Sequence, residues 1–353
     1  MHIASGTYTG TGVAQSVSGI GFTPKAVFIK GGANIMVART DTMATDSAKA
    51  MTGATALATD RVTSLDATGF TVGTDAQVNA NTVAYFWLAL GDSGGVDIET
   101  GSYAGDGNDD RSISLSTLSA KTPNVVMVFA STTDGAPYIR TSDMSTDDVT
   151  GGGHTSQPMD NADSGNKIQS IGSGAFVIGT AVEVNQAVGT PTFHWLALVN
   201  VAGFFKVFTY VGNSTQDDRT ITGAGFQPET AWTKRDNSAS IGVIKFKSNG
   251  TNVSYPVSNV DVTANEIQAW TADGFQIGTS SRVNATSANY YVVAFKDVLV
   301  TAGGGSGGGG QGGGRSRPGP RPGSGNGGNG GPGKKPGVTV SSRSRKRLYA
   351  GVL

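Results

Sequence analysis

The residues that could do chemistry are few, and their spacing fills no catalytic or metal-binding template. The chain of 353 residues has three histidines, His2, His154 and His194, and no cysteine. The histidines lie in unlike contexts without metal-ligand spacing, and the lack of cysteine excludes disulfides and thiolate zinc sites. His194 lies in an expected strand beside Trp195, which favours a partly buried ring. His154 follows three glycines, which favours a solvated loop.

One acidic segment could bind a metal ion. The sequence GDGNDDR at residues 105–111 places Asp106, Asn108 and Asp110 at alternate positions, as at the start of a calcium loop. No glutamate follows at the distance a calcium loop requires. The alternative is an exposed turn in which Asp and Asn accept hydrogen bonds from backbone N–H groups and the DDR carboxylates meet the arginine. We favour the turn and keep calcium as the alternative.

The remaining catalytic templates are also unfilled. The sequence contains no G-x-S-x-G elbow, no Walker loop and no carboxylate pair at matching positions of its copied segments. The glycine runs do not follow a strand to open a helix, so they do not indicate a nucleotide site. We therefore expect a protein that is not an enzyme and needs no cofactor.

A phrase of eleven residues occurs three times. The copies are GFTVGTDAQVN at 69–79, AFVIGTAVEVN at 175–185 and GFQIGTSSRVN at 274–284. Each is preceded by a Tyr-x-Gly step and followed by an aromatic, strand-like run, and the steps begin at Tyr8, Tyr103 and Tyr210. The intervals between these tyrosines are 95 and 107 residues. Copied elements at this period indicate a copied, domain-sized unit.

The composition favours an all-β fold. Gly, Thr, Ser, Ala, Val and Asn dominate, which suits short strands and tight turns. We expect three tandem β-sandwich-like repeats at 1–98, 99–203 and 204–301. The alternation in F-x-[VI]-G predicts a strand, and the glycine that ends it, Gly73, Gly179 or Gly278, is expected to supply a positive φ. The continuously apolar closing run predicts a strand that is covered on both faces.

Two further residue types recur at matching places. The asparagines Asn79, Asn185 and Asn284 end the phrase; they could be sugar ligands, but we favour hydrogen bonds to their own loop backbone. Trp87 and Trp195 match in the first two repeats, which favours core packing. Trp232 is also expected in a strand, whereas Trp270 lies just before a phrase and could lie nearer a loop.

Charge divides the chain into two parts. Residues 303–353 hold nine of the 26 basic residues and no acid, which leaves 17 basic and 26 acidic residues in the first 302. Residues 302–337 form a Gly/Pro-rich tether that cannot bury enough apolar surface to order itself. The start of the chain lacks an export signal and no span is long enough to cross a bilayer, so we expect a soluble protein without a membrane partner.

Residues 338–353 combine charge with apolar side chains. We expect this peptide to dock on a protein, with charges that steer it and apolar residues that fill pockets. Nucleic acid is the second candidate partner, because basic residues neutralise phosphates. The apolar residues, however, would have no role in binding it. The expected docking residues are Arg343, Arg345, Lys346, Arg347, Leu348, Tyr349, Val352 and Leu353.

The copied motifs resemble a known repeat. A Tyr-x-Gly-(Asn/Asp)-Gly turn, a G-F-x-P lead into an apolar strand, and G-F-x-[VI]-G before an aromatic strand are similar to a repeat in structural proteins of tailed bacteriophages, often associated with tail fibres and appendages. The matching stretches include GIGFTPKAVFIKG and GAGFQPETAWTKR, and the resemblance covers about residues 5–300. It implies a β-sandwich-like fold and a place in the virion, and it supplies no catalytic residues.

These observations lead to one expected function and one alternative. We expect a structural virion protein, assembled in the host cytoplasm, that serves as a tail fibre, a tail or neck appendage, or a head decoration. Its partners are other virion proteins, bound through the arm, and further copies of the chain are open as partners. The alternative is an adhesin whose repeat loops bind a host glycan or surface protein, for which tryptophans and tyrosines in loops would be the discriminating feature.

Overall fold

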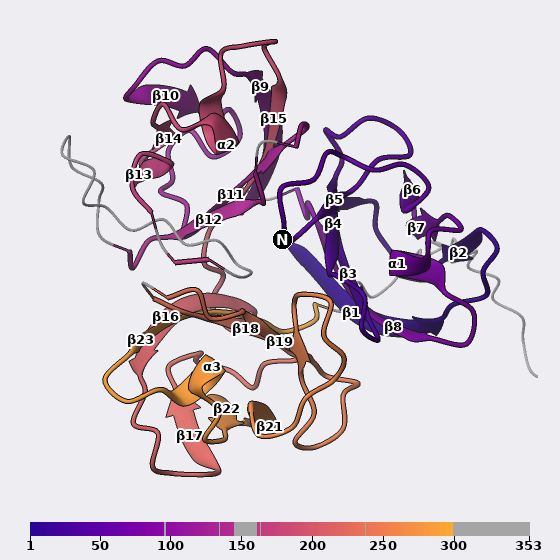
Figure 1. Ribbon diagram of the computed structural model, residues 1–353, viewed down its shortest axis with the longest axis vertical. Helices are drawn as coiled ribbons and strands as arrows, with labels where there is room; N and C mark the ends of the chain where they lie inside the picture. Colours follow the sequence, from indigo (N-terminus) through magenta and orange to yellow (C-terminus); the bar gives the residue numbers. More distant parts are fainter. Residues whose placement is uncertain (95–96, 134, 145–160, 163, 237, 299–353) are drawn as a thin grey trace, which may run out of the picture. The chain divides into compact units, whose positions relative to one another are not determined.

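The computed structural model of the chain describes residues 1–94, 97–133, 135–144, 161–162, 164–236 and 238–298. The described residues all belong to one compact unit. The fold is all-β, as the sequence predicts, and it contains three successive segments with one strand order (Figure 1). Each segment has a large and a small antiparallel sheet, and we call the segments the first, second and third sandwich.

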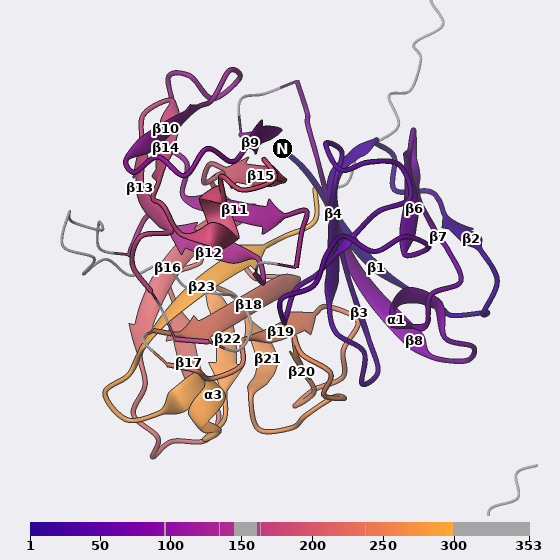
Figure 2. The ribbon, with the colours of Figure 1, turned by 45° about the horizontal axis from the view of Figure 1, so that its top comes forward.

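The first sandwich contains β1 (His2–Thr9), β2 (Gln15–Val17), β3 (Pro24–Gly31), β4 (Val37–Thr40), β5 (Lys49–Ala50), β6 (Val62–Asp66), β7 (Gly69–Val72), α1 (Ala76–Asn79) and β8 (Ala84–Gly91). Its large sheet has the order β1-β8-β3-β4-β5 and its small sheet β2-β7-β6. Figure 2 shows the small sheet as a separate layer beside β1, β3 and β4.

The second sandwich contains β9 (Ile98–Ala104), β10 (Arg111–Ser114), β11 (Val125–Ala130), β12 (Tyr138–Thr141), β13 (Ile168–Gly172), β14 (Ala175–Ile178), α2 (Val182–Asn185) and β15 (Thr192–Leu198). Its sheets have the orders β12-β11-β15-β9 and β10-β14-β13. The four strands of the large sheet correspond in order to β4, β3, β8 and β1.

The third sandwich contains β16 (Phe205–Val211), β17 (Arg219–Thr222), β18 (Thr230–Arg235), β19 (Val243–Phe246), β20 (Tyr255–Pro256), β21 (Ile267–Thr271), β22 (Gly274–Ile277), α3 (Ser281–Asn284) and β23 (Asn289–Phe295). Its sheets have the orders β16-β23-β18-β19-β20 and β17-β22-β21. The strand order of the first sandwich therefore returns in full.

The closing strands are buried on both faces, as expected. In β8 the alternate residues Tyr85, Trp87 and Ala89 pack between the two sheets of the first sandwich. The intervening Phe86 and Leu88 join a second cluster, to which the large sheets of all three sandwiches contribute. Because alternate side chains of a strand point to opposite faces, a continuously apolar run fits a sheet that lies between two cores.

The central cluster joins the sandwiches through aromatic contacts. The ring of Phe28 lies 5.5 Å from that of Trp232 of the third sandwich, and Phe86 lies 5.7 Å from Phe246. From the second sandwich, Met127 and Phe129 are buried in the same cluster. The three sandwiches therefore share a core in addition to having one each.

The described helices are single turns. Helices α1, α2 and α3 have four residues each, and no helix of the described residues could span a membrane. Each helix consists of the last four residues of the copied phrase, and its penultimate valine, Val78, Val184 or Val283, is fully buried. The phrase therefore encodes a strand, a turn and a helical turn that is fixed to the core.

Candidate functional site

The asparagine that ends each phrase is a buried structural residue. Asn79 is fully buried; its Nδ2 donates to the carbonyls of Gly73 and Val13, both at 2.6 Å, and its Oδ1 accepts from Thr11 N at 2.8 Å. Asn284 likewise donates to Gly278 O at 3.0 Å and accepts from Asn213 N at 2.8 Å. These amides tie the phrase to the loop that follows the Tyr-x-Gly step, so they are occupied inside the fold.

The tyrosine of the Tyr-x-Gly step closes the same region from the other side. Tyr103 donates to the carbonyl of Val184 at 2.7 Å, and Tyr210 donates to the carbonyl of Val283 at 2.7 Å. Tyr8 donates to Val78 O in the first sandwich. Each hydroxyl thus caps a carbonyl of the short helix, where intrahelical partners are lacking.

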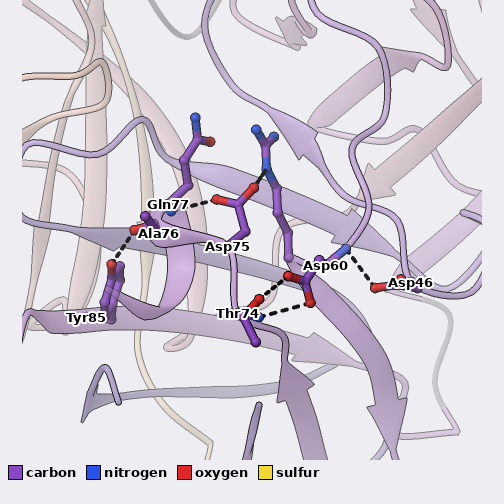
Figure 3. Close-up of polar contacts among 8 residues, drawn as sticks. Asp46, Asp60, Thr74, Asp75, Ala76, Gln77 and Tyr85 are labelled. Atoms are coloured by element: carbon purple, nitrogen blue, oxygen red, sulfur yellow. Dashed lines mark hydrogen bonds and ion pairs between the residues drawn. The ribbon is translucent and has the colours of Figure 1, made fainter. Parts of the chain in front are cut away.

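The turn before each helix depends on an Asp or Asn earlier in the chain. Figure 3 shows the carboxylate of Asp60 accepting from the backbone N–H of Thr74 at 3.0 Å and from its hydroxyl, while Asp46 accepts from Asp60 N at 2.9 Å. The hydrogen bonds from Thr74 hold the pKa of Asp60 below its usual range. Asn166 and Asn265 likewise accept from the backbone N–H groups of Thr180 and Thr279 through Oδ1. Toward the threonine hydroxyls, however, their Nδ2 groups donate.

The glycine at the end of the copied strand has a different role from the predicted one. At each of these turns the left-handed φ belongs to the Asx residue, at 62° for Asp60, 60° for Asn166 and 63° for Asn265. The three glycines do not have positive φ. A Cβ on Gly73 would lie 2.2 Å from Asp60 Oδ1, and Gly179 and Gly278 meet the same obstacle at 2.1 Å. The prediction of positive φ was wrong: glycine is required because the Asx residue packs directly on it.

In the first sandwich, Asp75 begins the helix. Its Oδ1 accepts from Gln77 N at 2.7 Å, as an N-cap residue does (Figure 3). Its Oδ2 also lies 3.2 Å from Arg61 Nε. The hydroxyl of Tyr85 donates to Ala76 O at 2.6 Å. Asp46, Asp60 and Asp75 are thus engaged as hydrogen-bond acceptors. No group of three or more acidic, His or Cys side chains in the described residues could hold a metal ion.

The calcium candidates lie in a turn closed by protein groups. Asp106 Oδ1 accepts from Asn108 N at 2.9 Å, and Asp106 Oδ2 lies 3.3 Å from Arg111 Nε. Asp110 has a left-handed φ of 53° and its N–H is bonded to Asp109 Oδ1 at 3.1 Å. We expected Arg111 to pair with a carboxylate of the DDR triplet. The carboxylate that pairs with it is that of Asp106 instead.

The histidines divide between described and undescribed regions. His194 is 5 % exposed, and its Nδ1 lies 3.0 Å from Thr42 Oγ1 of the first sandwich. Burial lowers the pKa of His194 to about 4, so the ring is neutral at pH 7. Burial also lowers the pKa of His2. His154 and the expected docking residues (Arg343, Arg345, Lys346, Arg347, Leu348, Tyr349, Val352 and Leu353) lie outside the described residues.

The tryptophans lie in strands. Trp87 and Trp195 pack edge-on against Phe70 and Phe176 in their sandwich cores, as predicted. Trp232 belongs to the shared cluster. Trp270 lies in β21, where the Lys245 ammonium is 5.9 Å from its ring centroid. Trp270 is paired with Phe275 across the sheet, one residue before the end of β21.

Sequence reasoning missed a set of buried cations. Arg39, Arg140 and Lys245 occupy matching positions in β4, β12 and β19 and are at most 5 % exposed. Arg39 donates to Val62 O and Arg140 to Ile168 O at 3.1 Å, so each ties the large sheet to the small one. The available signal was a basic residue at one place in the three runs VART, YIRT and VIKF.

Lys30 joins two sandwiches. It is fully buried, and its Nζ donates to Gly32 O at 2.8 Å and Asn34 O in the first sandwich. The same ammonium donates to Ser258 O at 3.1 Å and Val260 O at 3.0 Å in the third. Burial lowers the pKa of Lys30 to about 7, opposed by the charge of Asp261. The four carbonyl oxygens favour the charged form, because they replace the water that burial removes.

The recurring polar side chains hold segments of the described fold together. Many of their hydrogen bonds go to backbone groups, as for Asn79, Tyr103 and Arg140. A model of a domain of unknown function, DUF7483, matches residues 1–217 and again residues 200–307. No curated protein and no solved structure matches the chain. Because the two matches together span most of its length, the chain belongs to the DUF7483 family.

Proposed function

We propose that the chain is a non-enzymatic structural component of a tailed-bacteriophage particle. In this proposal the three sandwiches form the body of a tail fibre, a tail or neck appendage, or a head-decoration protein. Residues 338–353, carried on the tether 302–337, attach this body to a neighbouring virion protein. The motif resemblance described above supports a place in a phage particle. The division of charge supports attachment through the C-terminal arm.

The shared core is the observation that best supports a structural role. The large sheets of the three sandwiches bury Phe28, Met127 and Trp232 in one cluster. Lys30 adds hydrogen bonds from the first sandwich to the third. A body whose sandwiches bury apolar surface against one another resists relative motion, because separation would expose that surface to water. Rigidity of this kind suits a component that bears load or spans a distance.

The adhesin alternative finds less support. All four tryptophans, Trp87, Trp195, Trp232 and Trp270, lie in strands. Aromatic side chains in loops were the feature expected of a glycan-binding loop surface. The exposed large apolar residues include Val13, Val188 and Val211, and single exposed valines are ordinary for a protein surface.

The experiment removes the arm. A variant truncated after Thr301 should fold, because residues 1–304 form a compact unit of their own, and it should fail to sediment with purified particles that lack the native protein. A matched variant changes Leu348 and Tyr349 to Ser and keeps every charge; it should also fail to attach. If the truncated body still assembles onto particles, the arm is not the fastener. If nuclease treatment releases the full chain, the arm binds nucleic acid.

A further inference from the structure

A cleft of about 500 Å³ lies at one end of the first sandwich. Its lining includes the buried Arg39 and three charged groups, Lys25, Asp41 and Asp92, beside the apolar surfaces of Pro24 and Leu65. Small-ligand sites are typically about 300–1,000 Å³. The cleft therefore has the volume of a site for a small molecule, and its lining is mainly polar.

Arg39 is the unusual member of this lining. The residue is 5 % exposed, and its Nη1 donates to the carbonyl of Val62. Its Nε has no hydrogen-bond partner in the described residues. A buried guanidinium with an unused donor is costly unless a partner arrives. A carboxylate is the group that best matches its forked donors.

The same position is progressively closed in the other two sandwiches. In the second, the corresponding cavity is lined by Arg140, Ser142 and Ile171 and has a volume of about 130 Å³. In the third, Trp270 corresponds to Leu65, and its ring lies 5.9 Å from Lys245, which corresponds to Arg39. The open cleft is thus a feature of the first sandwich and not of the shared architecture.

The charges around the cleft determine the class of ligand. Lys25 Nζ lies 3.3 Å from Asp41 Oδ2, and Asp41 Oδ1 accepts from Thr100 Oγ1 at 2.5 Å. Asp92 Oδ1 accepts from Gly94 N at 2.9 Å. Two cations and two carboxylates line the cleft, so a bare anion would satisfy Arg39 and face Asp92 unfavourably. A ligand with both a carboxylate and hydroxyl donors can satisfy both signs of charge.

We propose that this cleft binds an acidic saccharide, whose carboxylate pairs with Arg39 and Lys25 and whose hydroxyl groups donate to Asp41 and Asp92. The apolar C–H face of the sugar ring contacts Pro24 and Leu65. The site lies in the body of the first sandwich and does not involve the arm. It goes beyond the proposed structural role, and it supplies a way in which a particle protein could also contact a glycan.

The test titrates the full chain with sodium glucuronate, followed by calorimetry or by NMR of the ligand. Leu65→Trp introduces the residue of the third sandwich, and it should weaken binding by at least about tenfold because the indole fills the cleft. Leu65→Ile introduces the residue that Ile171 supplies in the second sandwich. It is the milder control, and it should weaken binding less than Leu65→Trp does. Arg39→Lys keeps the charge and removes the fork, so it should also weaken binding, while circular dichroism verifies the fold.

Three ligand controls distinguish the outcomes. Glucose presents the hydroxyls without the carboxylate and should bind at least about tenfold more weakly than glucuronate. Acetate and inorganic phosphate present the anion alone and should also bind more weakly. Equal binding of phosphate and glucuronate would overturn the saccharide in favour of a simple anion site. Absence of glucuronate binding, or binding that Leu65→Trp leaves unchanged, would overturn the site itself. Particle attachment of the Leu65→Trp variant reports on the proposed function separately.

Discussion

Lys25 and Asp41 form an ion pair of 3.3 Å, and the third sandwich holds the corresponding pair with its charges exchanged. There Glu229 corresponds to Lys25 and Lys247 to Asp41, again 3.3 Å apart. In the second sandwich the pair is neutral, with Asn124 Nδ2 donating to Ser142 Oγ at 3.1 Å. The contact is retained while its chemistry changes, so the fold requires a compatible pair at this place and no particular charge.

The charges of Lys25 and Asp41 can be exchanged by substituting both residues. Lys25→Glu and Asp41→Lys should each lower the free energy of unfolding, because each places like charges side by side. The double variant should recover most of the loss, with a coupling of at most about 1 kcal/mol because both side chains are about one-third exposed. A double-mutant cycle, with unfolding in urea at low and at high salt, measures this coupling energy. Additive effects at low salt would contradict the pairing.

Asn79 provides a larger effect. Asn79→Ala should lower the free energy of unfolding by about 2–4 kcal/mol, because it leaves buried partners such as Gly73 O and Thr11 N without a hydrogen bond. Urea denaturation measures the change. Asn81→Ala is the matched control: the residue is exposed and two positions away, so its effect should be within about 0.5 kcal/mol. Equal effects of the two substitutions would show that Asn79 is not a structural tie.

The strands and their burial could be predicted because they depend on local pattern. The run YFWLAL is apolar at every position, and only a sheet covered on both faces accommodates that. The turn chemistry could be predicted only in part. Gly73 lacks a side chain because Asp60, thirteen residues earlier in the chain, packs on it, and no local pattern reveals a contact across a loop. A glycine after a strand suggested positive φ, which the Asx residue adopts instead.

The buried cations escaped prediction for a similar reason. A basic residue in a short strand ordinarily indicates a solvent-facing side. Arg39 is buried because the carbonyl of Val62, on the facing sheet, accepts its hydrogen bond. The proposed site at Arg39 is therefore visible only in three dimensions. Leu65, Ile171 and Trp270 occupy corresponding positions in the three sandwiches and fill the space beside the buried cation to different extents.

Gly6 and Trp87 form a second complementary pair. A Cβ on Gly6 would lie 2.5 Å from the indole of Trp87, whereas the third sandwich pairs Phe208 with Val292 at these positions. Gly6→Phe should destabilise by overpacking, and Trp87→Val should cost about 3–5 kcal/mol by leaving a cavity. The double variant should be more stable than the sum of the single effects predicts. Thermal unfolding of all four proteins measures this, and strict additivity would contradict the exchange of volume.

His194 should make the body sensitive to acid. Because its folded-state pKa of about 4 lies below the 6.5 of an unperturbed histidine, the unfolded state takes up the proton first as the pH falls. The His194 contribution is therefore fully present above about pH 6.5 and is lost as the pH approaches 4, with a size on the order of 3 kcal/mol. His194→Phe introduces the residue that Phe86 supplies in the first sandwich, and it should flatten the dependence over this interval. Urea denaturation of both proteins at pH 4.5, 5.5 and 7 measures the difference. If the free energy of unfolding changed equally with pH in the two proteins, His194 would not be the cause of the acid sensitivity.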